Sequence, residues 1–104
     1  MNPLAVYTTV DTEEAAQRLA RTIIEQHLAA CAQITRIDSI YWWEGKVQQS
    51  PEYRLLFKTT ESRYPALAEA IKRQHPYDLP ALYAVAFERC DAAFADWINA
   101  QSQP

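Results

Sequence analysis

Two histidines and two cysteines are the side chains of this sequence best suited to binding a transition metal. His75 comes at the end of a predicted helix and begins a loop, 75–80, that two prolines make rigid. A histidine at this position can also simply donate to the last carbonyl groups of its helix. His27 and Cys31 have the i, i+4 spacing of two ligands on one helical face, but the predicted helix ends before Cys31. His75 is therefore the best candidate ligand, and Cys31 can join it only if the fold brings the two together; otherwise Cys31 is a buried thiol.

Two further residues are candidates for contacting a small ligand. Lys58 closes an otherwise apolar strand segment, 55–57, where a cation is either solvated at the strand end or placed to meet an anion. Tyr77, in the proline-bounded loop, either lines the same cleft as His75 or only packs against its neighbours. Glu44 and Lys46 flank the single glycine and are most simply the solvated tip of a hairpin.

The sequence lacks the common catalytic motifs. It has no glycine-rich phosphate loop, no Gly-x-Ser-x-Gly elbow, no His-Glu-x-x-His and no Cys-x-x-Cys. We therefore expect a binding protein and not an enzyme.

Composition excludes two classes of partner. The formal net charge is −3 and the basic residues are scattered, so we expect no nucleic-acid binding. No apolar run approaches the roughly 20 residues of a membrane helix. The N-terminus does not resemble a secretory signal and two cysteines are too few for a disulfide framework, so we expect a cytoplasmic protein with reduced thiols. The 104 residues fit one domain, 1–104.

The elements that must position these side chains follow from periodicity and from turn residues. β-branched and aromatic runs predict strands over 4–9, 31–43, 53–60 and 81–87, the last one buried, with a turn region over 44–51. Helical spacing predicts a helix over 12–29 capped by Asp11 or Thr12, a second ending near His75 and capped by Thr60 or Ser62, and a third over 92–101. This βαββαβ order with a C-terminal helix predicts an α+β, ferredoxin-like fold, an antiparallel sheet with helices on one face.

The segment Tyr41-Trp42-Trp43-Glu44-Gly45-Lys46 points to self-association. Gly45 is where a hairpin turn needs a positive φ. Because adjacent strand residues face opposite ways, the helices of one subunit can cover one tryptophan, and the other is best covered by a second subunit. We therefore expect Tyr41, Trp42 and Trp43 to lie at an interface.

Four motifs resemble, in order and spacing, the CutA divalent-cation tolerance proteins: residues 28–31, 39–46, 58–59 and 75–80. The resemblance implies a ferredoxin-like subunit in a homotrimer, with hairpins extending each sheet into a neighbour and an architecture similar to that of the PII signalling trimers. It also implies copper tolerance and binding of divalent metal ions. Thr8 and Ala81 stand where relatives can have Cys and Glu, so the resemblance implies a weak copper site.

Two functions are therefore considered. The first is a homotrimeric divalent-cation tolerance protein that responds to metal ions and holds Cu²⁺ or another divalent cation near His75, with Cys31 as a second ligand. The alternative is a PII-like signalling or scaffold trimer. Its clefts between subunits would bind a small anion through Lys58, His75 and Tyr77.

Overall fold

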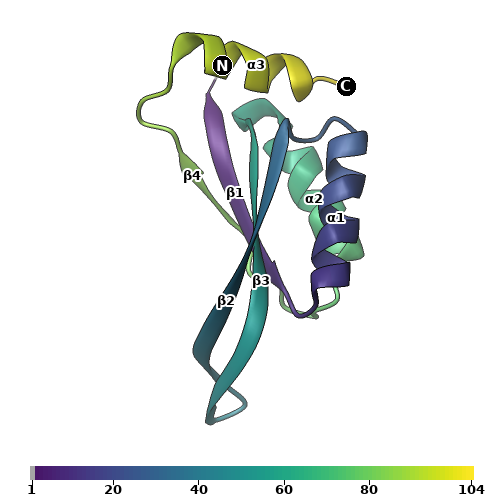
Figure 1. Ribbon diagram of the computed structural model, residues 1–104, viewed down its shortest axis with the longest axis vertical. Coiled ribbons are helices and arrows are strands. Elements are labelled where there is room, and N and C mark those ends of the chain that lie inside the picture. Colours follow the sequence, from purple (N-terminus) through teal and green to yellow (C-terminus); the bar gives the residue numbers. More distant parts are fainter. Residues whose placement is uncertain (1) are drawn as a thin grey trace.

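Four strands and three α-helices are found in residues 2–104, the part of the chain that the computed structural model describes (Figure 1). The elements, in chain order, are β1 (Pro3–Val10), α1 (Glu13–Glu25), β2 (Cys31–Trp43), β3 (Lys46–Thr60), the 3-10 turn η1 (Glu61–Arg63), α2 (Tyr64–Gln74), β4 (Tyr83–Ala86) and α3 (Ala92–Gln101). The strands form one antiparallel sheet in the order β2-β3-β1-β4, and α1 and α2 cover one face of it. The predicted ferredoxin-like α+β fold with a C-terminal helix is confirmed.

The core lies between that covered face and the two helices. Alternate residues of β1 and β3 point toward the helices, as the two-residue period of a strand requires. Helical spacing brings the apolar residues of α1 and α2 onto the same layer. The fully buried members with the largest side chains are Val6, Val10, Ile23, Leu55, Phe57, Leu67 and Ile71.

Helix α1 begins as predicted and ends earlier. Thr12 is the N-cap, and its hydroxyl accepts a hydrogen bond from the N–H of Ala15 at 3.1 Å. The helix stops at Glu25, four residues before the predicted end, because His27 adopts a left-handed φ of 55°. The N–H of His27 bonds the carbonyl of Ile24, and the N–H of Leu28 bonds that of Ile23, which is a Schellman ending. The reversal turns residues 28–29 back into the core.

The β2–β3 hairpin turns over two residues inside the predicted region 44–51, but the predicted start of the returning strand, Tyr53, was wrong, because the short turn lets pairing resume at Lys46. Glu44 and Gly45 have φ values of 52° and 76°, and β3 begins at Lys46. Gly45 therefore has the positive φ that the sequence predicted. Pro51 lies inside β3 and faces Asp38 of β2. Proline is tolerated there because β1 pairs with β3 only as far as Tyr53, so no strand needs its missing N–H on that side.

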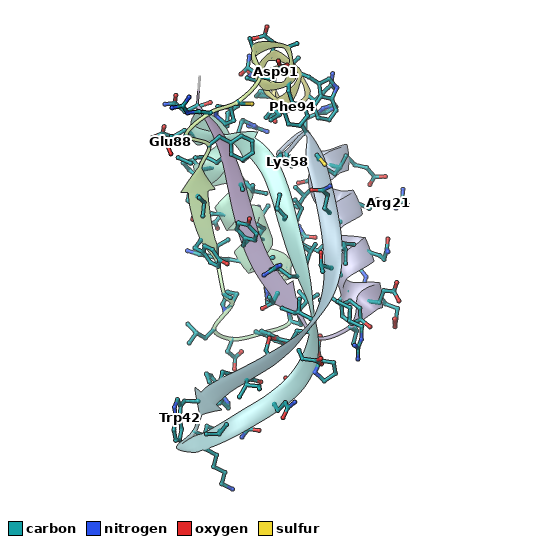
Figure 2. All side chains as sticks on the ribbon, turned by 60° about the vertical axis from the view of Figure 1, so that its left-hand side comes forward. Arg21, Trp42, Lys58, Glu88, Asp91 and Phe94 are labelled. Carbon is teal, nitrogen blue, oxygen red and sulfur yellow. The ribbon has the colours of Figure 1, made fainter. Side chains whose placement is uncertain are left out.

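The far half of this hairpin projects beyond the helices (Figure 1). Trp42 is 74% exposed and Trp43 is 47% exposed, and Figure 2 shows Trp42 at the far tip. The expectation that one subunit covers one of the two tryptophans was therefore wrong. They face opposite ways as predicted, but neither α1 nor α2 reaches that far along the hairpin.

The second helix ends as predicted but is capped differently. Its N-cap is Arg63, without a side-chain hydrogen bond, and the Thr60 hydroxyl lies 3.2 Å from that of Ser62. The predicted cap was wrong because η1 leads directly into α2, and its turn replaces a capping side chain. Pro65 lies in the first turn of the helix, and α2 ends at Gln74 because Pro76 disfavours a helical His75.

The last two elements lie at the margin of the sheet. Strand β4 is shorter than the predicted 81–87, and its four residues are exposed, not buried, because it is an edge strand paired with β1 alone. Helix α3 lies across one end of the sheet (Figure 1), where the rings of Phe94 and Trp97 stack with centroids 5.8 Å apart. Among the described residues, no helix is long and apolar enough to cross a membrane.

Candidate functional site

His75 is held between a strand and its own loop. The extended backbone of His75 turns its ring onto β1, where Nε2 lies 3.0 Å from Oγ1 of Thr8. The backbone N–H of Tyr77 donates to Nδ1 at 3.1 Å. Because Nδ1 accepts, the neutral ring carries its proton on Nε2 and donates it to Thr8. Both ring nitrogens are thus used within the subunit.

The surroundings of His75 act on its pKa in two directions. Burial of the ring lowers the pKa from its ordinary value. The backbone of Thr9 and the negative charges of Asp11 and Glu52 oppose that shift, and burial prevails. The neutral, doubly hydrogen-bonded ring is therefore the state that the fold favours.

Tyr77 connects this loop to the hairpin. The hydroxyl of Tyr77 donates to Oε2 of Glu52 at 2.7 Å, and the centroids of the Tyr77 and His75 rings are 5.1 Å apart. Glu52 is only 8% exposed, because the loop fills the space beside β3 where β1 has ended. Burial first, and then the Glu52 carboxylate, raise the pKa of Tyr77, so the phenol stays a donor. The bonds from Thr8 through His75 and Tyr77 to Glu52 join β1, the loop and the base of the hairpin.

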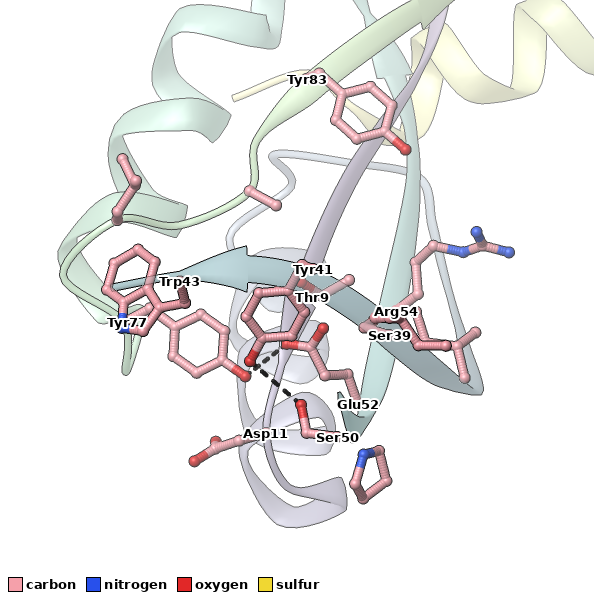
Figure 3. Close-up of a pocket in the computed structure, with 15 residues that line it drawn as sticks. Thr9, Asp11, Ser39, Tyr41, Trp43, Ser50, Glu52, Arg54, Tyr77 and Tyr83 are labelled. Atoms are coloured by element: carbon pink, nitrogen blue, oxygen red, sulfur yellow. Dashed lines mark hydrogen bonds between the residues drawn. The ribbon is translucent and has the colours of Figure 1, made fainter. Parts of the chain in front are cut away.

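A groove of about 780 Å³ lies on the uncovered face of the sheet beside these residues (Figure 3). One wall is the hairpin and the other is the loop between α2 and β4. The hairpin residues share a face because Ile37 pairs with Glu52, and the alternate residues Ser39, Tyr41 and Trp43 follow. The Tyr41 hydroxyl lies 3.3 Å from that of Ser50 across this wall. The residues that line the groove include Asp11, Tyr41, Trp43, Glu52, Arg54, Tyr77 and Ala81.

The structure brings His75 and Tyr77 together and places Cys31 and Lys58 elsewhere. Cys31 is half-buried at the start of β2 and pairs with Lys58, whereas Thr8, the partner of His75, pairs with Leu55. These registers are three residues apart along β3, roughly 10 Å. The ammonium of Lys58 lies 5.5 Å from the centre of the Phe94 ring, at the α3 end of the sheet (Figure 2). Lys58 does not line the groove that Tyr77 lines.

Sequence reasoning missed Glu52 and the contact of Thr8 with His75. Glu52 lies between the predicted turn region and the predicted strand, and a carboxylate in such a position is usually solvent-exposed. The one sequence feature that could have indicated a buried Glu52 is its position directly before an apolar and aromatic strand segment, 53–57. Tyr41 and Trp43 were predicted as interface residues, and in the subunit they also line the groove.

The donor atoms of one subunit do not make a complete metal site. No group of three or more His, Cys, Asp or Glu side chains with metal-binding geometry occurs within residues 2–104. His75 already uses both nitrogens, its neighbour Thr8 offers a neutral hydroxyl, and Ala81 on the groove wall has no donor. A metal at His75 would therefore have to displace a hydrogen bond, and the described residues of this chain do not supply a full set of further ligands.

Comparisons with known proteins agree with this architecture. Residues 4–101 match the family model described as CutA1 divalent ion tolerance protein. The chain is 44% identical over 97 residues to Protein CutA 1, chloroplastic, of Oryza sativa subsp. japonica, covering 92% of this chain and 55% of that relative. It is thus little more than half as long as the rice protein. It is 33% identical over 98 residues to the divalent-cation tolerance protein CutA of Thermococcus kodakarensis, covering 94% of each.

Solved structures give the same result. The crystal structure of CutA1 from Oryza sativa superimposes with a TM-score of 0.95 at 40% identity, covering 99% of this chain and 95% of that one. The structure named as the periplasmic divalent cation tolerance protein CutA from Archaeoglobus fulgidus gives a TM-score of 0.94 at 33% identity, covering 97% of this chain and 99% of that one.

Proposed function

Because this chain belongs to the CutA1 divalent ion tolerance protein family, we propose that it acts as a homotrimer that binds divalent cations such as Cu²⁺ weakly and takes part in the response to metal ions. The metal sites lie in clefts between subunits near His75. Subunits associate through the hairpin and the uncovered face of the sheet, with Tyr41, Trp42 and Trp43 at the contact.

The observation that carries this proposal is the apolar surface of the projecting hairpin. Ile40, Trp42 and Val47 on one face are more than half exposed, and Tyr41 and Trp43 on the other are partly exposed. An exposed cluster of this kind is typical of an interface. Over residues 46–50, on the hairpin side of Tyr53, β3 has no partner strand on its second side within the described part of the chain. Its backbone groups there are also available for pairing with another chain.

Metal binding is proposed to be weak for a structural reason. His75 can coordinate through Nε2 only after losing its bond to Thr8, and Cys31 lies at another register of the sheet. One chain offers too few donors near His75 for a complete ligand set, because a transition metal usually takes about four ligands. A trimer can supply the missing ligands from a neighbouring subunit. Binding is also expected to release the proton that Nε2 carries.

Two measurements test the proposal together. Sedimentation or light scattering at low micromolar concentration should give about three times the chain mass of 11.9 kDa. Calorimetric titration with Cu²⁺, Zn²⁺ and Mg²⁺ should show weak binding that His75→Ala largely removes. A folded monomer contradicts the assembly, and metal binding unaffected by His75→Ala contradicts the site.

The proposed compartment is the cytoplasm. This proposal is supported by the two free thiols, Cys31 and Cys90, because free thiols persist in the reducing environment of the cytoplasm. Fractionation of the native cell with an antibody to this chain tests the location.

A further inference from the structure

The hydrogen bonds of His75 leave neither ring nitrogen ready to coordinate a metal ion. Nε2 carries the proton and lies 3.0 Å from the hydroxyl of Thr8, and Nδ1 accepts the backbone N–H of Tyr77 at 3.1 Å. Because Thr8 is fully buried, a metal ion can reach Nε2 only if the ring moves away from that hydroxyl. Coordination therefore requires His75 to leave the position that it has in this structure.

Either way of coordinating a metal breaks the bond between Tyr77 and the His75 ring. A metal on Nδ1 takes the lone pair that the N–H of Tyr77 uses. A metal on Nε2 leaves the neutral ring with its proton on Nδ1, where it faces the N–H of Tyr77 as one donor faces another. Histidines that bind metals almost always donate their second N–H to an acceptor, and here that place holds a donor. His75 must therefore separate from Tyr77 to become a ligand.

The side chain of Tyr77 determines how easily the two residues separate. Its hydroxyl donates to Oε2 of the buried Glu52 at 2.7 Å, which ties the loop to β3 (Figure 3). In the described part of the chain, no backbone–backbone hydrogen bond outside the helices and strands involves residues 75–82. Leu79, in the middle of this segment, is 72% exposed and adds little packing. Tyr77 is therefore the main attachment of the loop to the rest of the subunit.

We propose that the hydrogen bond from Tyr77 to Glu52 is a latch, and that His75 can bind a metal ion only while this latch is open. The latch presupposes the metal site near His75 proposed above and controls access to that same site. Its bonds lie within one chain, so it does not require an open groove beside it. Because only the open molecules bind, a mostly closed latch weakens metal binding beyond the effect of the missing ligands.

Calorimetric titration of the assembled protein with Zn²⁺ tests the latch, and Tyr77→Phe is the main variant. Phenylalanine keeps the ring beside His75 and the backbone N–H, and it removes only the donor to Glu52. Zn²⁺ binding should become about tenfold tighter, the factor that a hydrogen bond to a charged group typically contributes to the closed loop. Tyr64→Phe, at the opposite end of α2 from His75, is the matched control and should leave the affinity unchanged.

A second variant separates the latch from direct coordination by Glu52, because Tyr77→Phe also frees the Glu52 carboxylate. Glu52→Gln keeps an acceptor for Tyr77 but weakens the bond, since the acceptor is no longer charged. The latch predicts Zn²⁺ binding a few-fold tighter in Glu52→Gln, whereas a carboxylate ligand predicts weaker binding. The gain of each variant should disappear when His75→Ala is added.

Amide hydrogen exchange gives a readout that needs no substitution in the latch. Because linkage is reciprocal, saturating Zn²⁺ should speed the exchange of the amides of residues 77–79 in the parent protein, as measured by mass spectrometry. In His75→Ala, Zn²⁺ should leave these rates unchanged. If Tyr77→Phe alters the mass or the near-ultraviolet circular dichroism, Glu52→Gln and this exchange measurement decide.

Two results overturn the latch. The first is unchanged or weaker Zn²⁺ binding in either folded variant. The second is unchanged or slower loop exchange in a parent protein that binds Zn²⁺. If the parent binds through His75 and the variants bind no more tightly, the latch is wrong and the proposed metal site stands. Binding through His75 that occurs only in the variants supports the latch and contradicts metal binding by the parent, and no binding in any form contradicts both.

Discussion

The hydroxyl of Thr8 lies 3.0 Å from Nε2 of His75, although the two residues are 67 positions apart in the sequence. Thr8 is fully buried on β1, and the end of α2 brings His75 over it. Thr8, where the resemblance to the CutA proteins implies that a cysteine can stand, is therefore in direct contact with the candidate metal ligand. A neutral hydroxyl at this place stabilises the imidazole but is a poor ligand for a soft metal.

Replacing Thr8 by Cys should convert this contact into a metal-binding pair. A thiolate next to Nε2 adds the ligand type that Zn²⁺ and copper prefer, so Zn²⁺ affinity should rise about tenfold or more. Calorimetric titration under reducing conditions measures the change. Thr9→Cys, one residue along the strand and on its other face, is the control and should bind no more tightly than the parent. Equal gains from both variants would show that the contact with His75 is irrelevant.

Ala81→Glu tests the second position at which the resemblance implies a missing metal ligand. The new carboxylate would lie on the groove wall and add an oxygen ligand and a negative charge. Cu²⁺ binding should therefore become tighter, by a few-fold, as measured by calorimetry. His75→Ala in the same background should return the affinity to a low value. Persistence of tight binding in the double variant would place the ligands elsewhere, with His27, Cys31 and Cys90 as the next residues to test.

The stability of the protein should depend on pH through His75. Burial holds its pKa below the ordinary value of 6.5, so the unfolded chain takes up the proton first as the pH falls. This contribution to the free energy of unfolding is fully present above pH 6.5 and is lost as the pH falls from there through the lowered pKa. Protonation also puts a hydrogen on Nδ1, opposite the N–H of Tyr77.

Chemical denaturation at fixed protein concentration, from about pH 7.5 to about pH 5, measures this effect. The parent should lose stability on acidification more steeply than His75→Gln. His27→Gln changes the other histidine and should keep the parent's slope. A slope that stays the same in His75→Gln would assign the acid sensitivity to other groups.

Trp42→Ala should weaken association more than it weakens the subunit. At 74% exposure the side chain has little of its surface buried within one chain, so a cost comparable to the ~3–5 kcal/mol of a deleted buried aromatic can arise only at the interface. Sedimentation over a concentration series measures it as a shift toward smaller species. Glu14→Ala, on the exposed surface of α1, is the control. A Trp42→Ala variant that associates like the parent would exclude the tip from the interface.

Gly45→Val should destabilise the hairpin through backbone strain alone. The φ of 76° is unfavourable for a β-branched residue, and a Cβ at this position would meet no atom within 4 Å. The expected cost is about 1–3 kcal/mol, read as a fall in melting temperature. Gly45→Asn should cost less, because Asn tolerates a left-handed conformation. Melting of the Val variant within a degree of the parent would contradict the assigned turn.

The sequence by itself determined the elements and their order, because strand and helix periodicities, the two prolines of the loop and the single glycine are local signals. Thr12 as a cap, Gly45 as a turn and the end of α2 before Pro76 are all set by interactions within a few residues. The resemblance to the CutA family also came from the sequence alone, through the order and spacing of four short motifs, 28–31, 39–46, 58–59 and 75–80. These features need no knowledge of the partners across the fold.

Only the tertiary structure decided which of those side chains meet. The early end of α1 depends on a left-handed His27, and the exposure of both tryptophans depends on how far the helices reach along the hairpin. The bonds from Thr8 to His75 and from Tyr77 to Glu52 join residues 67 and 25 positions apart. Sequence spacing carries no information about such pairs, because sheet register and the path of the loop between α2 and β4 decide them.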